Sequence, residues 1–209
     1  MNENTRVSGE IWLVVGVQAS GKSTAADLLA RQFDAGVHVR GGEFYRWAVR
    51  GWVHHDDERA SEARRLLDLR YRLSAKVADE YCTAGFTTVV QDNIYGSDVV
   101  AWLSLVSARP RHLVVLRPSI EVVGEREELR RRTTGKAAYR EGGVSIEELD
   151  DQLSLTPHVG LWLDTSALSP QETVDEILRR RSEAIVDEIA GDLKDAGTPG
   201  PTSNFRTLE

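Results

Sequence analysis

The stretch Gly16-Val17-Gln18-Ala19-Ser20-Gly21-Lys22-Ser23 follows the pattern G-x-x-x-x-G-K-[ST], which is that of a phosphate-binding P-loop. Before it, residues 11–15 form a short run of apolar side chains, as expected for a strand buried on both faces. After it, Ala25, Leu28, Leu29 and Phe33 recur at intervals close to three and four, which is typical of a helix packed on one face. The stretch therefore lies between a strand and a helix over 22–33, as phosphate binding requires.

The residue types in this stretch suit a nucleoside triphosphate. Gly16 and Gly21 permit backbone angles that side chains disfavour, so successive N–H groups can turn inward. The helix adds unpaired first-turn N–H groups and the positive end of its dipole. We expect Lys22 to reach the β- and γ-phosphates and the Ser23 hydroxyl to ligate Mg²⁺. The predicted nucleotide-binding residues here are Gly16, Gln18, Ala19, Ser20, Gly21, Lys22, Ser23 and Thr24. A glycine-rich turn that binds no ligand is the disfavoured alternative.

Composition limits the class of protein. The chain has 209 residues, enough for one domain with a substantial core, and its net charge of −7 argues against a general binder of nucleic acids or membrane surfaces. Its one cysteine, Cys82, cannot form an internal disulfide, which suits a reducing compartment. We find no leader peptide and no apolar run of about 18 residues, so we expect a cytoplasmic protein without a membrane partner. The oligomeric state cannot be read from the sequence.

Strands and helices alternate along the rest of the chain. Further strands are predicted at 37–40, 86–91, 112–116 and 161–163, and helices at 43–50 and 59–84, from Ser97, from Ser145, and from Ser169 to about Leu193. This order predicts an α/β fold, a three-layer α/β/α P-loop NTPase sandwich with a parallel five-stranded sheet. We expect a kinase domain over 10–193, a flexible N-terminus over 1–9 and a disordered tail over 194–209.

Local patterns predict which helix faces are buried and where helices begin. The long helix is expected to bury Leu66, Leu69, Leu73, Val77 and Tyr81, and the last helix Val174, Ile177, Leu178, Ile185 and Ile189. Ser145 with Glu148, and Ser169 with Glu172, form capping boxes that mark helix starts. Pro170 supports the second of these, because proline is favoured at the first helical position.

Ligands of such sheets bind beyond the carboxyl ends of the strands, where Asp92 follows an apolar strand. A P-loop protein needs an acid here, so we favour a role for Asp92 in catalysis and in holding Mg²⁺, directly or through water. The alternative is an ordinary turn, because Gln-Asp-Asn is a common turn composition.

Residues 117–143 are rich in arginine and are predicted to form a lid. Arg126 and Arg130 are four residues apart, so they share one helical face, and both are candidates for stabilising the transferred phosphoryl group. Arg131, Arg132 and Lys136 are further cations of this segment. The alternative is a solvated charged helix, in which Glu121, Glu125, Glu127 and Glu128 pair with the arginines.

The phosphoryl acceptor is expected after the second strand. Glu43 is the candidate general base, and Arg40 and Arg46 suit a polar or anionic acceptor. Trp47 and Trp52 suit an apolar wall of the same pocket. Equally open is the reading in which Phe44 and Trp47 are core and Glu43 favours a helix N-terminus. His54-His55-Asp56-Asp57 has metal-ligand residue types, but a solvated loop is the favoured interpretation because adjacent side chains diverge.

Several stretches resemble the small P-loop kinases known as AAA-type ATPases or phosphotransferases. They are the P-loop, Val-His-Val-Arg-Gly at 37–41, Val-Val-Gln-Asp at 89–92, Glu-Arg-Glu at 125–127 and Leu-Trp-Leu-Asp-Thr-Ser at 161–166. Such proteins are similar to chloramphenicol phosphotransferase and, more distantly, to gluconate kinases, shikimate kinases and zeta toxins. The resemblance covers roughly residues 10–190, and of its motifs the P-loop is the specific one.

The resemblance implies roles for further residues. It places Arg126 and the loop Asp164, Thr165 and Ser166 around an adenine. The family frame Arg-Gly-Asp after the second strand reads Arg40-Gly41-Gly42 here, followed by Glu43. Three readings follow from this departure: Glu43 substitutes for the usual base, Asp92 does that work, or the acceptor is unusual.

The sequence thus predicts a kinase that uses ATP and Mg²⁺ to phosphorylate a hydroxyl of a small metabolite or antibiotic. A nucleoside, nucleotide or polynucleotide kinase is one alternative, although the acidic net charge disfavours a long nucleic acid. An ATP-binding regulator without catalysis is the other. The acceptor itself and the choice between ATP and GTP are left open.

Overall fold

A parallel sheet of five strands forms the centre of the computed structural model, which describes residues 9–51, 53, 60–135, 137, 139 and 143–187. The strands are β1 Ile11–Val15, β2 Gly36–Arg40, β3 Thr87–Gln91, β4 Arg111–Leu116 and β5 Leu161–Leu163. Their order is β2-β3-β1-β4-β5, so the strand before the P-loop lies in the middle of the sheet. The predicted α/β fold with five parallel strands is confirmed.

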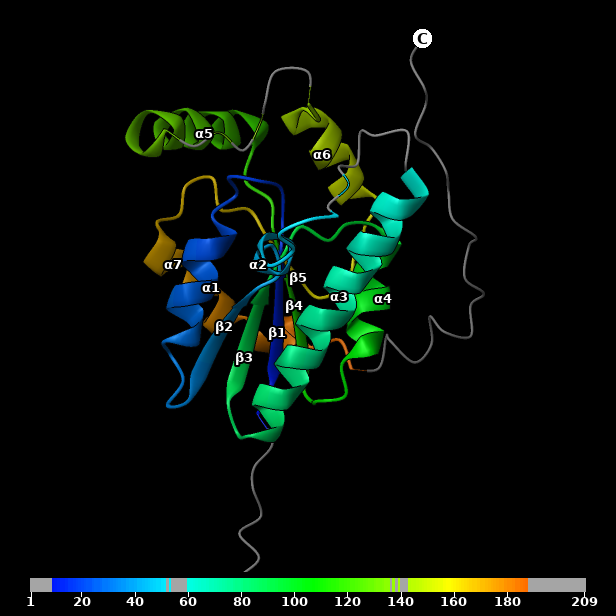
Figure 1. Ribbon diagram of the computed structural model, residues 1–209. Helices are drawn as coiled ribbons and strands as arrows, with labels where there is room; N and C mark the ends of the chain where they lie inside the picture. Colours follow the sequence, from blue (N-terminus) through cyan, green and yellow to red (C-terminus); the bar gives the residue numbers. More distant parts are fainter. Residues whose placement is uncertain are drawn as a thin grey trace, which may run out of the picture.

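Helices cover both faces of this sheet, which gives the three predicted layers (Figure 1). Helices α1 (Lys22–Ala30) and α7 (Pro170–Arg179) lie on one face, and α3 (Ala60–Thr83) and α4 (Ser97–Leu105) on the other. Helices α5 (Ile120–Thr134) and α6 (Ile146–Ser154) lie beyond the carboxyl ends of the strands, at the top of Figure 1. These two helices therefore cover the edge of the sheet at which the site is expected.

Strand β1 shows why both faces are apolar. Its five residues are fully buried, and their side chains alternate between two core clusters. Leu13 faces the cluster under α3 and α4, while Trp12 and Val14 face the cluster under α1 and α7. Such double burial explains the continuous apolar run before the P-loop, because neither face of the strand meets water.

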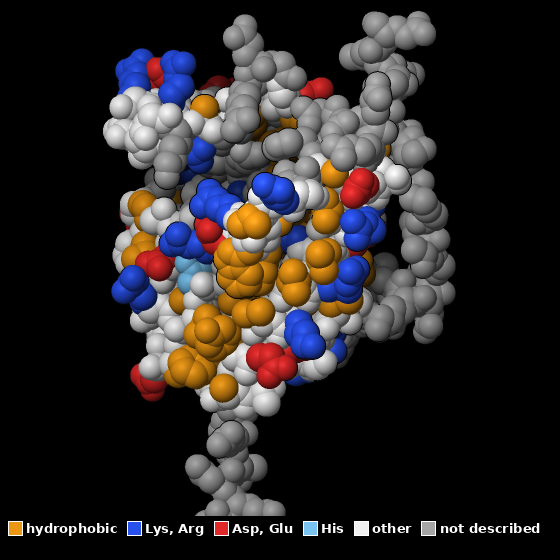
Figure 2. Space-filling model, in the orientation of Figure 1, with side chains coloured by type: hydrophobic (Ala, Val, Ile, Leu, Met, Phe, Trp, Pro, Cys, Tyr) orange, Lys and Arg blue, Asp and Glu red, His pale blue; other side chains and the backbone are white. Residues whose placement is uncertain are grey.

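Helix α3 is rotated relative to the prediction. Three residues of the expected apolar stripe are exposed, Leu69 and Leu73 at 38% each and Tyr81 at 42%, while Leu66 and Val77 are partly buried. The buried face consists instead of Ala63, Arg70, Tyr71, Ser74, Ala75, Ala78 and Cys82. Small side chains let the helix backbone approach the sheet closely. We infer that this close packing stabilises the helix more than burial of the larger leucines would. Figure 2 shows the apolar side chains that remain on the surface of this side of the molecule.

Several predicted helix boundaries need correction. Helix α1 ends at Ala30 rather than near residue 33, and α2 covers Glu43–Arg46 rather than 43–50. Gly96, rather than Ser97, is the N-cap of α4. The last helix ends at Arg179 and is followed by a short helix α8, Arg181–Ala184, rather than continuing to about 193. Directly after α8, Ile185 leaves the helical conformation and forms an antiparallel bridge with His112 of β4.

Both predicted capping boxes are present. The Ser145 hydroxyl accepts a hydrogen bond from the backbone N–H of Glu148, and Ser169 accepts one from Glu172 in the same way. Pro170 stands at the first position of α7, as predicted. These short motifs were reliable because every contact that they make lies within one turn of the chain.

Some expectations concern residues outside the described ranges. They are Trp52, the His54–Asp57 run, Lys136, most of the N-terminal segment 1–9, and the tail 194–209. Among the helices that are described, none has both the length and the apolar character needed to cross a membrane.

Candidate active site

The P-loop turns between β1 and α1 with the backbone angles that its glycines were expected to permit. Gly16 has φ 151° and Gly21 has φ 95°, both in the region that favours glycine. A Cβ on Gly16 would lie 2.4 Å from the carbonyl oxygen of Leu116, so packing also excludes a side chain there. Ala19, with φ 63°, adopts a left-handed conformation without being glycine. Together these angles wrap the loop around the N-terminus of α1.

Lys22 lies buried beneath this loop, where its Nζ donates a 2.5 Å hydrogen bond to the carbonyl oxygen of Val17. Burial lowers its pKa to about 7; Asp92 opposes the shift, and Arg130 adds to it. An anion in the loop would supply the negative charge that this ammonium group lacks. Ser23, next in the chain, donates a 3.0 Å hydrogen bond to Oε1 of Gln91 at the end of β3.

Two cavities meet at the P-loop. One, of about 630 Å³, lies between α1, α5 and the loop before α7. It is lined by Ala19, Ser20, Gly21, Lys22, Ser23, Thr24, Ala25, Leu116, Arg126, Leu129, Arg130, Thr133, Thr165, Leu168, Pro170 and Thr173. Its outer wall is largely apolar, while its inner end is the phosphate-binding loop. We call it the nucleotide cavity.

The other cavity, of about 770 Å³, opens on the opposite side of the loop, and its walls come from α2, α3, α6 and the segment after β3. We call it the acceptor cavity. Its lining includes Gln18, Arg40, Gly42, Glu43, Tyr45, Arg46, Arg64, Arg70, Tyr71, Asp92, Tyr95 and Asp98. Ala19, Lys22, Ser23 and Arg130 line both cavities. A phosphoryl group held by these four residues would thus be reachable from either side.

Of the lid arginines, Arg126 and Arg130 face the nucleotide cavity. Arg126 donates hydrogen bonds to the carbonyl oxygens of Ser20, at 3.2 Å, and Thr165, at 2.7 Å, and so connects the P-loop to the loop after β5. Arg130 lies 3.4 Å from a carboxylate oxygen of Glu127 and borders both cavities. The prediction that the two share one face therefore agrees with their positions, while their roles in catalysis stay predictions.

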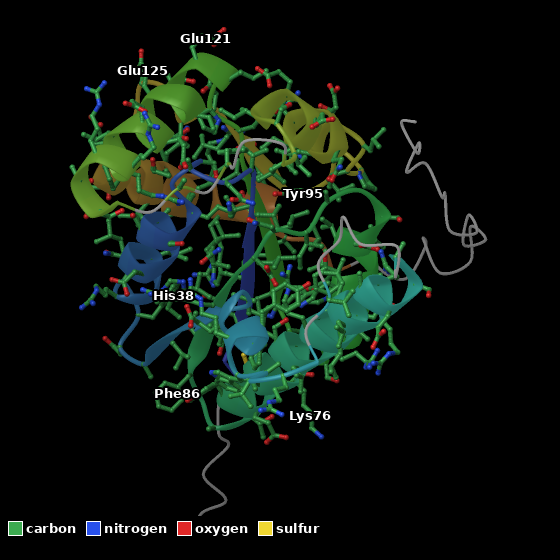
Figure 3. All side chains as sticks on the ribbon, turned by 45° about the horizontal axis from the view of Figure 1, so that its top comes forward. His38, Lys76, Phe86, Tyr95, Glu121 and Glu125 are labelled. Atoms are coloured by element: carbon green, nitrogen blue, oxygen red, sulfur yellow. The ribbon has the colours of Figure 1, made fainter. Side chains whose placement is uncertain are left out.

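The other charged residues of α5 lie at its surface. Arg131 and Arg132 both form ion pairs with Glu128, and their side chains are 63% and 74% exposed. Figure 3 shows Glu121 and Glu125 on the outer side of the helix, pointing away from the sheet. The solvated reading therefore fits this outer face, and the functional reading remains for the inner one.

The loop after β5 contributes one of its predicted residues to the cavity. Thr165 lines the nucleotide cavity, and its buried Oγ1 has no hydrogen-bond partner. Asp164 is exposed and lies outside the lining, where its Oδ1 accepts hydrogen bonds from the backbone N–H and hydroxyl of Ser166 at 2.8 and 2.5 Å. Asp164 thus holds the loop in its conformation, while Thr165 lines the cavity in which we expect the adenine.

Asp92 is the buried carboxylate of the acceptor cavity. Its Oδ1 lies 2.8 Å from Nη2 of Arg70, and its Oδ2 has no hydrogen-bond partner. Burial raises the pKa of Asp92, against the opposing effect of Arg70. A Cβ on Gly41 would lie 2.0 Å from Oδ2, so the carboxylate occupies the space that this glycine leaves.

The residues present suit a magnesium ion. Asp92, whose Oδ2 has no partner, and Ser23 of the P-loop line the same cavity, and Mg²⁺ prefers oxygen ligands supplied by a few side chains, phosphates and water. Within the described ranges there is no cluster of three or more His, Cys, Asp or Glu residues that could hold a metal by itself. The phosphates would therefore have to complete such a site.

The predicted acceptor residues fall into two groups. Arg40, Glu43 and Arg46 line the acceptor cavity, and Glu43 accepts a 2.7 Å hydrogen bond from Nη1 of Arg46. Trp47 does not line it, because its ring packs on Phe44 with a centroid distance of 4.9 Å and stays 70% exposed.

Sequence reasoning missed the contribution of α3. Arg64 and Arg70 both line the acceptor cavity, Arg64 in a two-bond pair with Asp98 at 2.8 Å and Arg70 against Asp92. Tyr95, central in Figure 3, donates a hydrogen bond to the Gly16 carbonyl oxygen at 3.3 Å. An arginine on the polar face of a predicted helix gives no sequence signal of burial. The sequence pattern alone therefore could not place Arg64 and Arg70 at the cavity.

Solved structures with this fold include several small-molecule kinases. A sugar kinase from Janibacter sp. superposes with a TM-score of 0.58 at 20% identity, over 84% of this chain and 96% of that chain. A gluconokinase from Sinorhizobium meliloti gives 0.53 at 18% identity, over 92% and 99%. A shikimate kinase from Aquifex aeolicus gives 0.52 at 18% identity, over 83% and 96%. At such identities the likeness concerns the fold.

Sequence comparison adds the family. No curated protein matches the chain significantly. The model of the AAA_33 family, described as an AAA domain, matches residues 11–155, which contain the P-loop, Asp92 and all of α6. The match covers well over half of the chain and agrees with the P-loop kinase fold. The chain therefore belongs to the AAA_33 family of P-loop domains.

Proposed function

We propose that this protein is a kinase that transfers the γ-phosphoryl group of ATP, with Mg²⁺, to a hydroxyl group of a small molecule. The observation that supports this most is the meeting of two cavities at the P-loop, through Ala19, Lys22, Ser23 and Arg130. A nucleotide in one cavity and an acceptor in the other would place the transferred group between them. Phosphoryl transfer depends chiefly on such positioning and on electrostatic stabilisation.

Each side chain has a role in this proposal. Lys22 and Arg130 neutralise the charge that spreads over the transferred group, and Arg126 holds the adenine side of the nucleotide closed. Ser23 and Asp92 would hold Mg²⁺, which neutralises the β- and γ-phosphates when it is bound. Arg40 and Arg46 suit a polar or anionic acceptor at the opposite end.

Two carboxylates compete for the role of general base. Asp92 is buried and offers an unpartnered oxygen, while Glu43 is engaged by Arg46. Glu43→Gln is expected to lower the rate of transfer more than the affinity for ATP if Glu43 is the base. An unchanged rate would assign the role to Asp92, and Asp92→Asn would then abolish turnover.

The decisive experiment removes the P-loop lysine. Lys22→Ala is expected to abolish MgATP turnover, because no other ammonium group reaches the loop among the described residues. Lys76→Ala is the matched control, since Lys76 is exposed on α3 and lines neither cavity. ADP release measured with purified protein decides the question, and full activity in Lys22→Ala would refute the proposal.

An ADP-release screen over sugars, nucleosides and antibiotics separates the remaining readings. Turnover with a nucleoside would select a nucleoside kinase. Tight binding of ATP without turnover in any of these mixtures would select a regulator instead.

A further inference from the structure

Two consecutive glycines, Gly41 and Gly42, border the acceptor cavity for different reasons. Gly41 must be glycine, because a Cβ there would overlap the carboxylate of Asp92. At Gly42 an added Cβ would meet no heavy atom within 4 Å. Its backbone angles, φ −62° and ψ −20°, are those of an ordinary right-handed helix, which any residue adopts. Neither packing nor backbone geometry therefore requires glycine at position 42.

Local stability also disfavours glycine at this position. In a helical conformation glycine loses more backbone freedom on folding than alanine does. What the missing side chain does provide is open volume, because Gly42 lines the acceptor cavity.

The surroundings of this open volume are suited to a hydroxyl compound. The side chain of Asp92 lines the same cavity, and the neighbouring Gly41 leaves the space that its buried, unpartnered Oδ2 occupies. Arg40, two residues before Gly42, also lines the cavity and forms no ion pair with the residues that the structure describes. A group beside Gly42 would therefore meet one proton acceptor and one cation.

We propose that Gly42 is a specificity-determining residue, whose open volume receives the hydroxyl-bearing part of the acceptor beside Asp92. This inference rests on the proposed kinase function. In the reaction the acceptor oxygen forms a bond to the γ-phosphorus as the bond from that phosphorus to the β,γ-bridging oxygen breaks. ADP leaves with the electron pair of that bond, and the hydroxyl proton passes to a carboxylate and then to solvent.

The test fills the volume in two steps, with Gly42→Ala and Gly42→Val. Ala101→Val is the matched control, because Ala101 is an exposed residue of α4 outside both cavities. Calorimetry measures the affinity for MgATP, and radiolabelled ATP measures transfer. Glycerol, D-gluconate and shikimate are the acceptors, and transfer to water is the reference, because water does not need the volume beside Gly42. Thermal unfolding verifies that each variant is folded.

We expect Gly42→Val to lower transfer to these hydroxyl compounds by at least about tenfold, with Gly42→Ala intermediate, while transfer to water and the MgATP dissociation constant stay within about twofold. Where glycerol, D-gluconate or shikimate accepts the phosphoryl group, the loss should grow with the size of the acceptor. Ala101→Val should behave as the unmodified chain. A Gly42→Val protein with unchanged transfer to these compounds would overturn the inference, as would an equal loss of MgATP affinity or an unmodified chain without measurable transfer.

These outcomes separate the inference from the proposed function. If the unmodified chain fails to bind MgATP, the kinase proposal itself fails. If it binds MgATP and phosphorylates these hydroxyl compounds, but Gly42→Val does the same at the same rate, the kinase stands and Gly42 has no part in selecting the acceptor.

Discussion

Asp92 depends on two neighbours that hold it from different sides. Gly41 leaves the space that its Oδ2 occupies, and Arg70 pairs with its Oδ1 at 2.8 Å. The guanidinium of Arg70 also lies over the ring of Tyr45, 4.3 Å from its centroid, which fixes the arginine in turn. The orientation of this carboxylate is thus set by residues from β2, α2 and α3 together.

Gly41→Ala is expected to displace Asp92, because the new Cβ would lie 2.0 Å from Oδ2 and 2.4 Å from Cγ. We expect MgATP turnover to fall by about tenfold or more, since small displacements of a reacting group carry penalties of that order. Steady-state ADP release measures this. Ala101→Val, an exposed position of α4 outside both cavities, is the control. Equal kinetics of the Gly41→Ala and unmodified proteins would contradict the prediction.

Arg70→Met should leave the buried Asp92 carboxylate unpaired. We expect the free energy of unfolding to fall by about 3 kcal/mol, in line with the loss of one partner from a buried ion pair. Arg64→Met is the control, because Arg64 lies on the same helix and lines the same cavity, but its side chain is 52% exposed. Loss of that more exposed pair should cost about 1 kcal/mol or less. Urea unfolding compares the two variants, and equal losses would contradict the distinction.

At the scale of elements, helix α3 shows where sequence reasoning reaches its limit. Its leucines recur at helical spacing, so periodicity assigned them to the core, yet Leu69 and Leu73 remain 38% exposed. The sheet instead contacts Ala75 and Ala78, which are at most 1% exposed. A periodic pattern identifies a face by hydrophobicity, but it does not measure how closely that face must approach its neighbour.

Substitutions on the two faces of α3 test this arrangement. Ala75→Leu should overpack the buried face and lower the free energy of unfolding by about 1–3 kcal/mol. Leu69→Ala, on the exposed face, should change it by less than about 1 kcal/mol. Chemical denaturation of both variants gives the comparison. The predicted face would be reinstated if Leu69→Ala proved the more damaging change.

The parts predicted well from sequence are those whose contacts are local or repeated. The P-loop, β1 and the capping boxes at Ser145 and Ser169 each carry their signal within a few residues. The pair Arg70–Asp92 joins helix α3 to the residue that follows β3, and the bridge from Ile185 to β4 follows directly on the end of α8. Such long-range contacts leave no local pattern to read.

At the scale of the whole molecule, a buried cluster of polar side chains lies at the end of the sheet opposite the P-loop. His112 of β4 is fully buried, stacks on Trp12 of β1 at 3.9 Å, and contacts Oε2 of Glu10 at 2.9 Å. Arg181 of α8 contacts the same carboxylate oxygen. This cluster joins β1, β4 and the end of the described chain.

Glu10 should make stability depend on pH. Burial raises its pKa, but the hydrogen bond with His112 and the charge of Arg181 outweigh this, so the pKa lies below the ordinary 4.5. The stabilisation from ionised Glu10 is thus complete at pH values above its pKa in the unfolded chain. It is lost as the pH falls through its lower pKa in the folded protein. Glu10→Gln should be less stable than the unmodified chain near neutral pH, with the difference shrinking below about pH 4. Urea titrations at both pH values test this; a difference independent of pH would contradict it.

The shared border of the two cavities has a consequence for inhibitor design. A bisubstrate compound, with adenosine at one end and a polyol at the other joined by a chain of phosphates, could lie across Ala19, Lys22, Ser23 and Arg130. Tethering the two ends would make the second binding event intramolecular, so such a molecule should bind far more tightly than either half alone. The number of phosphates in the compound that binds best would then measure the distance between the bound nucleotide and the bound acceptor.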